Sequence, residues 1–196
     1  WMSCYCLTEP GAGSDANSGK TKAVLTEDGK HYLITGQKMW ISNAGFADVF
    51  IVFARIEDDK NITGFILDKG MEGITLGEEE HKLGLNSSST RQVFFNDVKV
   101  PIESLLGGRG NGFKIAMNAL NVGRIKLSAA ILDACRRVIG LSANYANERV
   151  QFGNPIAKFG AIQHKLADMA TRTFAIESAT YRAGAEIEKN IARLES

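Results

Sequence analysis

Short apolar runs alternate with turn-forming residues along the first hundred positions of the chain. Five runs have the length and composition of β-strands, at residues 20–25, 32–41, 49–54, 65–67 and 93–95. The first two flank Asp28-Gly29, a dipeptide that suits the positive φ angles of a tight hairpin turn. Gly, Asn or Asp bounds the later runs, and no helix-length period separates them. This pattern predicts an antiparallel β-barrel or sandwich.

The hydrophobic period changes after Pro101. Apolar side chains recur at steps of three and four residues from Phe113 to Tyr145, and again from Ile162 to Ile187. The dipeptide Asn154-Pro155 and the preceding glycine lie between the two stretches and are typical of a helix stop. We therefore predict two long amphipathic helices in an antiparallel hairpin, which is half of a four-helix bundle.

Together these patterns predict an α+β fold with two domains. We assign residues 1–103 to the β-barrel domain and residues 104–196 to the first two helices of a helical bundle. Each apolar helix stripe needs a partner, and two helices cannot cover both stripes. The chain also begins within a predicted strand and ends within a helical pattern. We therefore expect a fragment of a longer protein.

Composition and charge exclude several classes of protein. Hydrophobic residues make up 44% of the 196 positions and charged residues 23%, as in a globular protein. The net charge of +1 gives no reason to expect a nucleic-acid partner. No apolar run approaches the roughly 20 residues of a membrane span, and no signal peptide is visible. We therefore expect no nucleic acid and no stable membrane insertion.

Cysteine and histidine residues give no sign of a metal centre. The three cysteines, Cys4, Cys6 and Cys135, include no Cys-x-x-Cys pair, which indicates reduced thiols. The three histidines lie far apart, at positions 31, 81 and 164, without the spacing of metal ligands or a catalytic base. We expect no metal site.

The candidate chemistry lies in the loop from Tyr5 to Asp15. Gly, Ser and Thr are dense here, so unpaired backbone N–H groups and hydroxyls face a ligand such as a phosphate or a heterocycle. Pro10 fixes the bend, and the flanking glycines leave space for a ligand. The nearby Gly19-Lys20-Thr21 invites a P-loop interpretation. We reject it because Ser14 replaces a required Gly and a hairpin, not a helix, follows the Lys.

Combined with residues 36–43, this loop strongly resembles the middle domain of the acyl-CoA dehydrogenases. Other segments continue the resemblance in the family's order, at residues 93–101, 112–117 and 148–153. Within the family, residues 40–43, 121–124 and 159–163 are most similar to the very-long-chain branch.

The resemblance implies a β-barrel and a four-helix bundle with FAD between them, and an oxidoreductase activity in fatty-acid β-oxidation. The family converts an acyl-CoA thioester to a trans-2-enoyl-CoA by α,β-dehydrogenation and passes electrons to an electron-transferring flavoprotein. A homo-dimer or homo-tetramer is implied, in the cytoplasm of a bacterium or the mitochondrion of a eukaryote. An acyl-CoA oxidase remains an alternative, as does a non-catalytic flavin- or acyl-CoA-binding module.

The resemblance also assigns flavin contacts in the predicted β-domain. Tyr5, Cys6, Leu7 and Thr8 would line the isoalloxazine ring, and Gly13 and Ser14 would lie toward the phosphates, with Ser14 also reaching the CoA. In the second segment, Trp40 would pack against the ring beside Ile41, and the Ser42 hydroxyl would lie near flavin N5. A hydrogen-bond donor there favours the negative charge that arrives during reduction. For Trp40 alone, a core aromatic remains the alternative.

Further contacts are implied in the helical part. Arg149, Gln151 and Phe152 resemble the family motif that reaches across a dimer interface to the partner's FAD, where a guanidinium suits a pyrophosphate. A charge that complements the helix dipole is the alternative for Arg149. Asn121 and Arg124 match positions near the substrate. A structural ion pair is equally open for Arg124.

The resemblance leaves the chain without a catalytic base. Most branches have a Glu far downstream, which would lie C-terminal to Ser196, and Gly123 occupies the alternative base position. Because glycine cannot abstract a proton, we expect the isolated 196-residue chain to be inactive. Gly160 also replaces a Gln that contacts FAD in other branches, so that contact would fall to backbone or to Gln163.

Overall fold

The computed structural model describes residues 1–195, and Ser196, the end of the predicted helical pattern, lies outside the described residues. Trp1–Asn118 form one compact unit, called unit 1, and the chain from Ala119 onward forms a second, called unit 2. The division falls within a helix that begins in unit 1. The functional boundary predicted at residues 103 and 104 stays a prediction.

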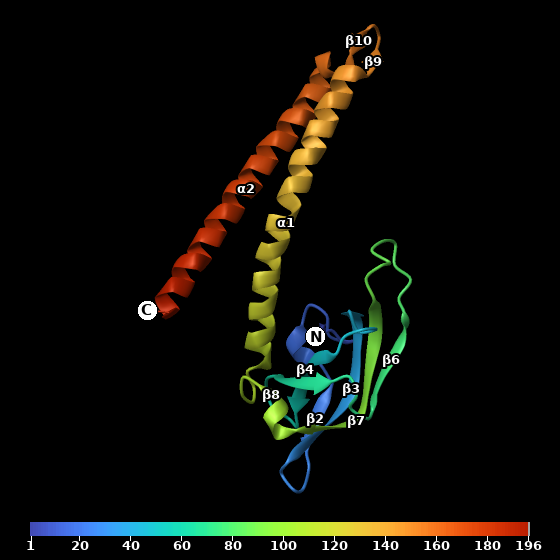
Figure 1. Ribbon diagram of the computed structural model, residues 1–196, viewed down its shortest axis with the longest axis vertical. Coiled ribbons are helices and arrows are strands. Elements are labelled where there is room, and N and C mark those ends of the chain that lie inside the picture. The colour runs from blue at the N-terminus through green and yellow to red at the C-terminus, as the bar shows by residue number, and fades with distance from the viewer. Residues whose placement is uncertain (196) are drawn as a thin grey trace. The chain divides into compact units, whose positions relative to one another are not determined.

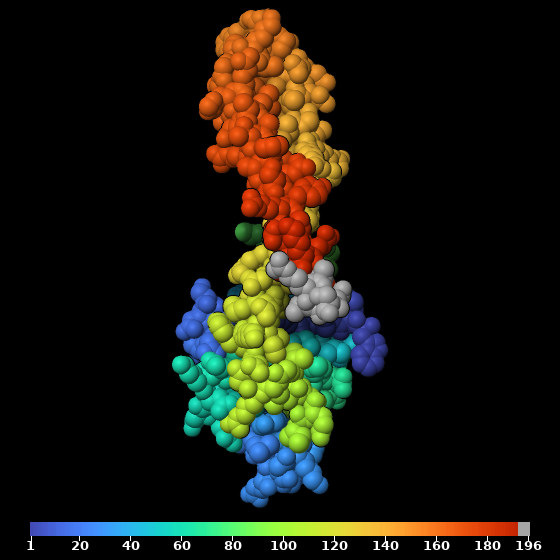
Figure 2. Space-filling view, turned by 90° about the vertical axis from the view of Figure 1, so that its left-hand side faces the viewer, coloured from blue at the N-terminus to red at the C-terminus, as the bar shows by residue number. Residues whose placement is uncertain are grey.

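Unit 1 is built on a mixed β-sheet (Figure 1). Its strands are β1 (Ser3–Cys6), β2 (Lys22–Leu25), β3 (His31–Ser42), β4 (Val49–Ile56), β5 (Thr63–Asp68), β6 (Ile74–Glu79), β7 (Thr90–Pro101) and β8 (Leu105–Leu106). The strand order is β6-β7-β3-β2-β4-β5-β8, and β1 pairs with β4 beside this path. Short 3-10 helices follow β1 (η1, Ala16–Ser18) and β7 (η2, Ile102–Ser104). The β2–β3 hairpin projects from the unit, blue in Figure 2.

The predicted closed antiparallel barrel is not confirmed. The two ends of the strand order, β6 and β8, do not pair with each other. The sheet changes direction at β4. The first half of this strand pairs in parallel with β1, whereas Arg55 and Ile56 at its end pair in parallel with β2. The sheet therefore consists of two mainly antiparallel parts, of which one also contains the parallel pair of β1 with β4. The short parallel contact of β2 with β4 joins the two parts, and a common core lies between them.

The core of unit 1 forms because both parts of the sheet point one face inward. Side chains from β3 and β7 meet those from β4 and β5, and the buried set includes Ile34, Val93, Val98, Phe50, Val52, Phe65 and Leu67. Alternation places Phe50 with Val52, and Phe65 with Leu67, on one face of their strands. In β7 the pairing with β3 shifts between Phe95 and Val98, so that Val93 and Val98 both point inward although they are an odd number of residues apart. The five strands predicted from apolar runs are confirmed as β2, β3, β4, β5 and β7, whereas β6 was not predicted.

Two cysteines of β1 share the inner face of the sheet. The sulfurs of Cys4 and Cys6 lie 3.6 Å apart and both residues are buried. Hydrogen bonding to Cys4, with burial, raises the pKa of the Cys6 thiol well above its ordinary value. Both thiols are free, as predicted, and so is the partly buried Cys135.

Unit 2 consists of a helical hairpin, which confirms the two predicted helices. Helix α1 (Gly112–Glu148) and helix α2 (Gly160–Glu195) are joined by β9 (Val150–Gln151), β10 (Asn154–Pro155) and the 3-10 helix η3 (Ile156–Lys158). The helices lie against each other near this connection, orange in Figure 2. The guanidinium of Arg136 forms an ion pair with Glu177 between the helices.

Much of the apolar surface of the hairpin stays uncovered within unit 2. The side chains that are more than half exposed include Leu127, Val138, Leu141, Tyr145, Phe174 and Tyr181. These are the residues of the predicted apolar stripes. The expectation that two helices cannot cover both stripes is therefore confirmed for the described residues.

Helix α1 meets the length and composition of a membrane span, contrary to our expectation from the sequence. Among the described residues it is the one such helix, with a stretch of mean hydropathy 1.2 of which 11% is buried. Length and composition do not distinguish a membrane span from a helix that packs within a bundle. The absence of stable membrane insertion stays a prediction.

Candidate functional site

The loop after β1 folds back on itself at Pro10-Gly11. The backbone groups of Glu9 and Ala12 exchange two hydrogen bonds of 3.1 Å, and Gly13, Ser14 and Asp15 follow on the surface. A Cβ added at Gly11 or Gly13 would meet nothing within 4 Å. Neither glycine has a positive φ, so the described residues give no internal reason for glycine there. Both positions leave the space that a ligand would need.

The end of β1 and the end of β3 lie side by side. The backbone N–H of Met39 donates to the carbonyl of Thr8 at 2.9 Å. This contact brings Thr8 beside Met39, directly before the segment from Trp40 to Ser42. The side chains of Cys6 and Leu7 are buried in the core. Only their backbone groups could therefore contact a flavin.

Tyr5 fastens the start of α1 to β1 within unit 1. Its hydroxyl donates to the carbonyl of Ala116 at 3.1 Å, and its ring packs edge-on against Phe53 at 5.2 Å. Burial raises the pKa of Tyr5 to about 12. The phenol therefore acts as a neutral hydrogen-bond donor at physiological pH.

Trp40 leaves the sheet through a bulge in β3. The pairing of β3 with β7 shifts between Lys38 and Ile41, and Trp40 has a φ of 59°. This conformation costs a bulky residue about 1–3 kcal/mol. It turns Ile41 into the core and leaves Trp40 55% exposed, with Ser42 also on the surface. The alternative of a core aromatic for Trp40 is therefore wrong.

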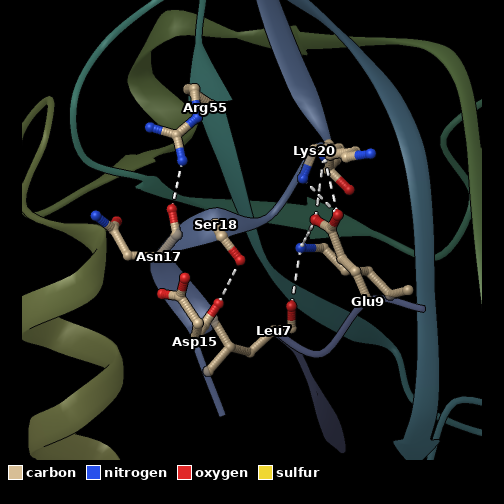
Figure 3. Close-up of polar contacts among 9 residues, drawn as sticks. Leu7, Glu9, Asp15, Asn17, Ser18, Lys20 and Arg55 are labelled. Carbon is tan, nitrogen blue, oxygen red and sulfur yellow. Dashed lines mark hydrogen bonds and ion pairs between the residues drawn. The ribbon is translucent and has the colours of Figure 1, made fainter. Parts of the chain in front are cut away.

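A buried ion pair between Glu9 and Lys38 supports this region, and we did not predict it (Figure 3). The ammonium of Lys38 donates to Glu9 Oε1 at 2.7 Å and to the carbonyl of Leu7 at 3.0 Å. The Glu9 carboxylate also accepts the backbone N–H groups of Lys20 at 2.5 Å and Thr21 at 3.1 Å. Three donor groups thus surround the buried Glu9 carboxylate, and one of them, the Lys38 ammonium, also binds the Leu7 carbonyl.

Opposing effects set the pKa values of this pair. Burial alone would raise the pKa of the Glu9 carboxyl, but the charge of Lys38 and the hydrogen bonds outweigh it and lower that pKa. Burial lowers the pKa of Lys38, while the charge of Glu9 opposes this. The 2.7 Å contact and the backbone donors are those of a charged pair.

A second cluster holds the far end of the loop, and it was also not predicted (Figure 3). The guanidinium of Arg55 donates to the carbonyls of Asn17, Asp59 and Lys60. The side-chain oxygen of Asn17 accepts the backbone N–H of Ile62 at 3.2 Å. The exposed residues Gly13 to Asp15 therefore lie between two anchored points.

The turn of unit 2 presents the three residues assigned to a partner's FAD. Phe152 has a φ of 53° and is 92% exposed, with its ring edge-on to Phe159. Gln151 is exposed, and its amide nitrogen donates to the Val150 carbonyl. Among the described residues, the exposed guanidinium of Arg149 has no hydrogen-bond or ion-pair partner. It lies directly after the last residue of α1, so the helix-dipole alternative stays open.

The residues assigned to the substrate lie together on α1. Arg124 donates to the side-chain oxygen of Asn121 at 2.8 Å, and both are exposed. Among the described residues, Arg124 is therefore an exposed charge with an amide partner, and it forms no ion pair. A Cβ at Gly123 would meet nothing within 4 Å, so this position is open as well.

The chain matches two domains of a single enzyme family. Residues 4–98 match the acyl-CoA dehydrogenase middle domain, and residues 110–194 match the acyl-CoA dehydrogenase C-terminal domain. Together the two matches take in most of the chain. The chain belongs to the acyl-CoA dehydrogenase family.

The chain is also similar to individual members of this family. It is 48% identical over 192 residues to a probable acyl-CoA dehydrogenase of Bacillus subtilis, covering 98% of this chain and 32% of the relative. It is 43% identical over 196 residues to the human very long-chain specific acyl-CoA dehydrogenase, covering 96% of this chain and 30% of that protein. The chain thus spans about a third of the length of these relatives.

A solved structure has the same fold. The crystal structure of an acyl-CoA dehydrogenase complexed with FAD from Bacillus anthracis superposes with a TM-score of 0.88 at 46% identity. The match covers 97% of this chain and 32% of that one. The roles of individual residues stay predictions.

Proposed function

We propose that this chain is part of an FAD-dependent acyl-CoA dehydrogenase and supplies one wall of its flavin site. The observation that carries the proposal is the exposed Trp40, held at a positive φ beside Thr8 and Ser42 in a chain of this family. Strain at a bulky residue is retained where the surroundings impose it, and such positions cluster at ligand sites. The open positions at Gly11 and Gly13 also fit a cofactor.

Several of the predicted residues are exposed and could contact the cofactor or the substrate directly. Trp40 would stack on the flavin ring, and the exposed Ser42 hydroxyl would donate a hydrogen bond toward N5. Gly13 and Ser14 would face the phosphates, where small exposed groups permit close approach. Asn121 and Arg124 would orient the thioester substrate through their linked polar groups.

The substrate is an acyl-CoA, and its Cα loses a proton while its Cβ loses a hydride. Bound FAD would accept the hydride, and trans-2-enoyl-CoA is the product. We propose a homo-oligomer in which Arg149, Gln151 and Phe152 reach a second copy's FAD, and an electron-transferring flavoprotein as the acceptor. The enzyme would work in the cytoplasm of a bacterium or the mitochondrion of a eukaryote.

We propose that the base comes from outside residues 1–196, because position 123 is a glycine. The polypeptide of residues 1–196 is then expected to show no acyl-CoA oxidation, whereas the full-length protein oxidises acyl-CoA. Turnover by the 196-residue polypeptide would contradict this assignment.

The test is Trp40→Ala in the full-length protein. FAD should bind the wild type with a structured visible absorption spectrum, and the variant should bind at least about tenfold more weakly because it loses the stacking surface. Leu85→Ala is the matched control, since Leu85 is also apolar, exposed and at a positive φ of 55°. Equal affinities for both variants would contradict the role of Trp40.

The same preparation separates the alternative activities. A dehydrogenase reduces its flavin with acyl-CoA and needs an electron-transferring flavoprotein for turnover. An oxidase would instead release one hydrogen peroxide per enoyl-CoA. A binding module would take up FAD and leave it oxidised when acyl-CoA is added.

A further inference from the structure

The Glu9–Lys38 pair is a charged element buried in the core behind the proposed flavin wall. The side chain of Lys38 is 2% exposed and that of Glu9 is 7% exposed. Lys38 lies on the inner face of β3, in step with Tyr32 and Ile34. An apolar side chain of similar length would fill this space without the cost of burying two charges. Packing alone therefore does not explain why a charged side chain occupies this position.

The contacts of Lys38 join the loop after β1 to β3. Its ammonium holds the carbonyl of Leu7 and the carboxylate of Glu9, and the next backbone N–H, that of Met39, holds the carbonyl of Thr8. Three consecutive residues of the loop are thus fixed against two consecutive residues of β3. Trp40 follows directly after these two residues, at the bulge.

Glu9 also fixes the other end of the loop. Its carboxylate accepts the backbone N–H groups of Lys20 and Thr21, so it closes the loop from residue 9 to residue 20. A Cβ at Gly19 would lie 2.8 Å from Glu9 Oε1, which shows how closely the chain approaches the carboxylate. Gly13 and Ser14 lie within the closed loop.

We propose that Glu9 and Lys38 are positioning residues for the flavin. The pair sets the position of residues 7–20 relative to Trp40 and Ser42, and so fixes the two sides of the wall against each other. Neither side chain needs to touch the cofactor, because both are buried behind the exposed residues. This inference rests on the proposed function.

The decisive test compares two variants of the full-length protein. Lys38→Met removes the ammonium but leaves the Glu9 charge buried and unpaired, so it lowers the melting temperature as well as FAD affinity. The double variant Lys38→Met with Glu9→Gln removes both charges, so its melting temperature should return toward the wild-type value. It still lacks the donor to the Leu7 carbonyl. We expect its FAD affinity to stay at least about tenfold below wild type, with an altered visible circular dichroism of the bound flavin.

Lys82→Met is the matched control. The ammonium of Lys82 also donates to a backbone carbonyl, that of Ser88, and to the Thr90 hydroxyl, but in the β6–β7 hairpin. This variant should bind FAD with wild-type affinity and an unchanged flavin spectrum. Comparing the FAD affinities of the Lys38→Met and Lys82→Met variants shows whether the loss of affinity is specific to the hydrogen bond behind Trp40. A general effect of removing any lysine-to-carbonyl hydrogen bond would appear in both variants.

The outcomes distinguish the two proposals. Wild-type affinity and circular dichroism in a stable double variant would overturn the positioning role while leaving flavin binding intact. A double variant that melts well below wild type would show that the pair serves the fold alone, and would also overturn it. A wild-type protein that takes up no flavin would overturn the proposed function, and the positioning role with it.

Discussion

Lys38 and Trp40 are two residues apart in β3 and exchange the usual places of their residue types. The charged residue is buried and the aromatic residue is exposed. The period of two that places Tyr32 and Ile34 inside also points Lys38 inward, and this signal was available from the sequence. Its partner Glu9 lies 29 residues earlier in the chain, and no local pattern connects the two. Nothing in the sequence indicates a positive φ at Trp40. The bulge in β3 could therefore not be predicted and is known only from the structure.

A single side chain, that of Tyr5, joins β1 to the start of α1, and its removal has a measurable effect. Tyr5→Phe keeps the ring contact with Phe53 and removes the hydrogen bond to the Ala116 carbonyl, so the free energy of unfolding should fall by about 1 kcal/mol. The wild type should also lose stability as pH rises from 10 toward 12, because the unfolded phenol ionises first while burial keeps the folded one protonated. The variant should lack this loss.

Urea unfolding at pH 7 and at pH 11 measures both effects. Tyr145→Phe is the control, because Tyr145 is 59% exposed and no hydrogen bond of its hydroxyl occurs among the described residues. Equal stability of Tyr5→Phe and wild type at pH 7 would show that the bond to α1 contributes nothing.

At the scale of elements, apolar runs predicted strands well where both faces of a strand are buried. β4 is such a strand, and its continuous apolar run is visible in the sequence. β6 was missed because only Ile74 and Leu76 interrupt a polar segment that is half-buried at a sheet edge. The barrel was predicted because apolar runs indicate strands but not their partners. The parallel pairing of β4 with β1 and β2 joins segments that no turn signal connects.

Glu79 holds the β6–β7 hairpin together and gives it a pH dependence. Its carboxylate accepts from the Ser89 hydroxyl and Arg91 Nε, both at 2.7 Å, and from the Thr90 N–H at 2.9 Å. These hydrogen bonds, that of Ser89 first, lower the pKa of Glu79 from 4.5 to about 2. Because the folded pKa is the lower one, the stabilisation is full above about pH 4.5 and is lost as pH falls toward 2.

Glu79→Gln should therefore flatten the acid limb of the stability curve between pH 4.5 and pH 2. Melting temperatures of the variant and the wild type across this range provide the measurement. Glu72→Gln serves as the control for removal of a carboxylate in the same unit, since no hydrogen bond of its side chain occurs among the described residues. Parallel curves for wild type and Glu79→Gln would contradict the assignment.

At the scale of the whole chain, the two units differ in how completely they bury their apolar residues. Unit 1 has a continuous core between the two parts of its sheet, whereas unit 2 leaves both helix stripes largely uncovered. The helical period predicted this difference, because two helices present more apolar surface than they can share. It could not predict the few contacts that join them, such as the ion pair of Arg136 with Glu177. Ion-pair partners on separate helices depend on the rotation of each helix about its axis, which periodicity defines only coarsely.

The uncovered stripes predict that the 196-residue polypeptide self-associates in solution. Leu127, Leu141 and Phe174 are each more than half exposed on these stripes, and exposed apolar side chains that gather on one face favour contact with other chains. Sedimentation velocity across a hundredfold range of concentration should show a mass that rises with concentration. Replacing these three residues with Gln should reduce the association because less apolar area is then buried between chains. As a control, Val24→Gln and Leu85→Gln remove exposed apolar side chains from unit 1 and should leave the association unchanged. A constant monomer mass for the wild-type polypeptide would mean that α1 and α2 cover their stripes against each other in solution more fully than in this structure.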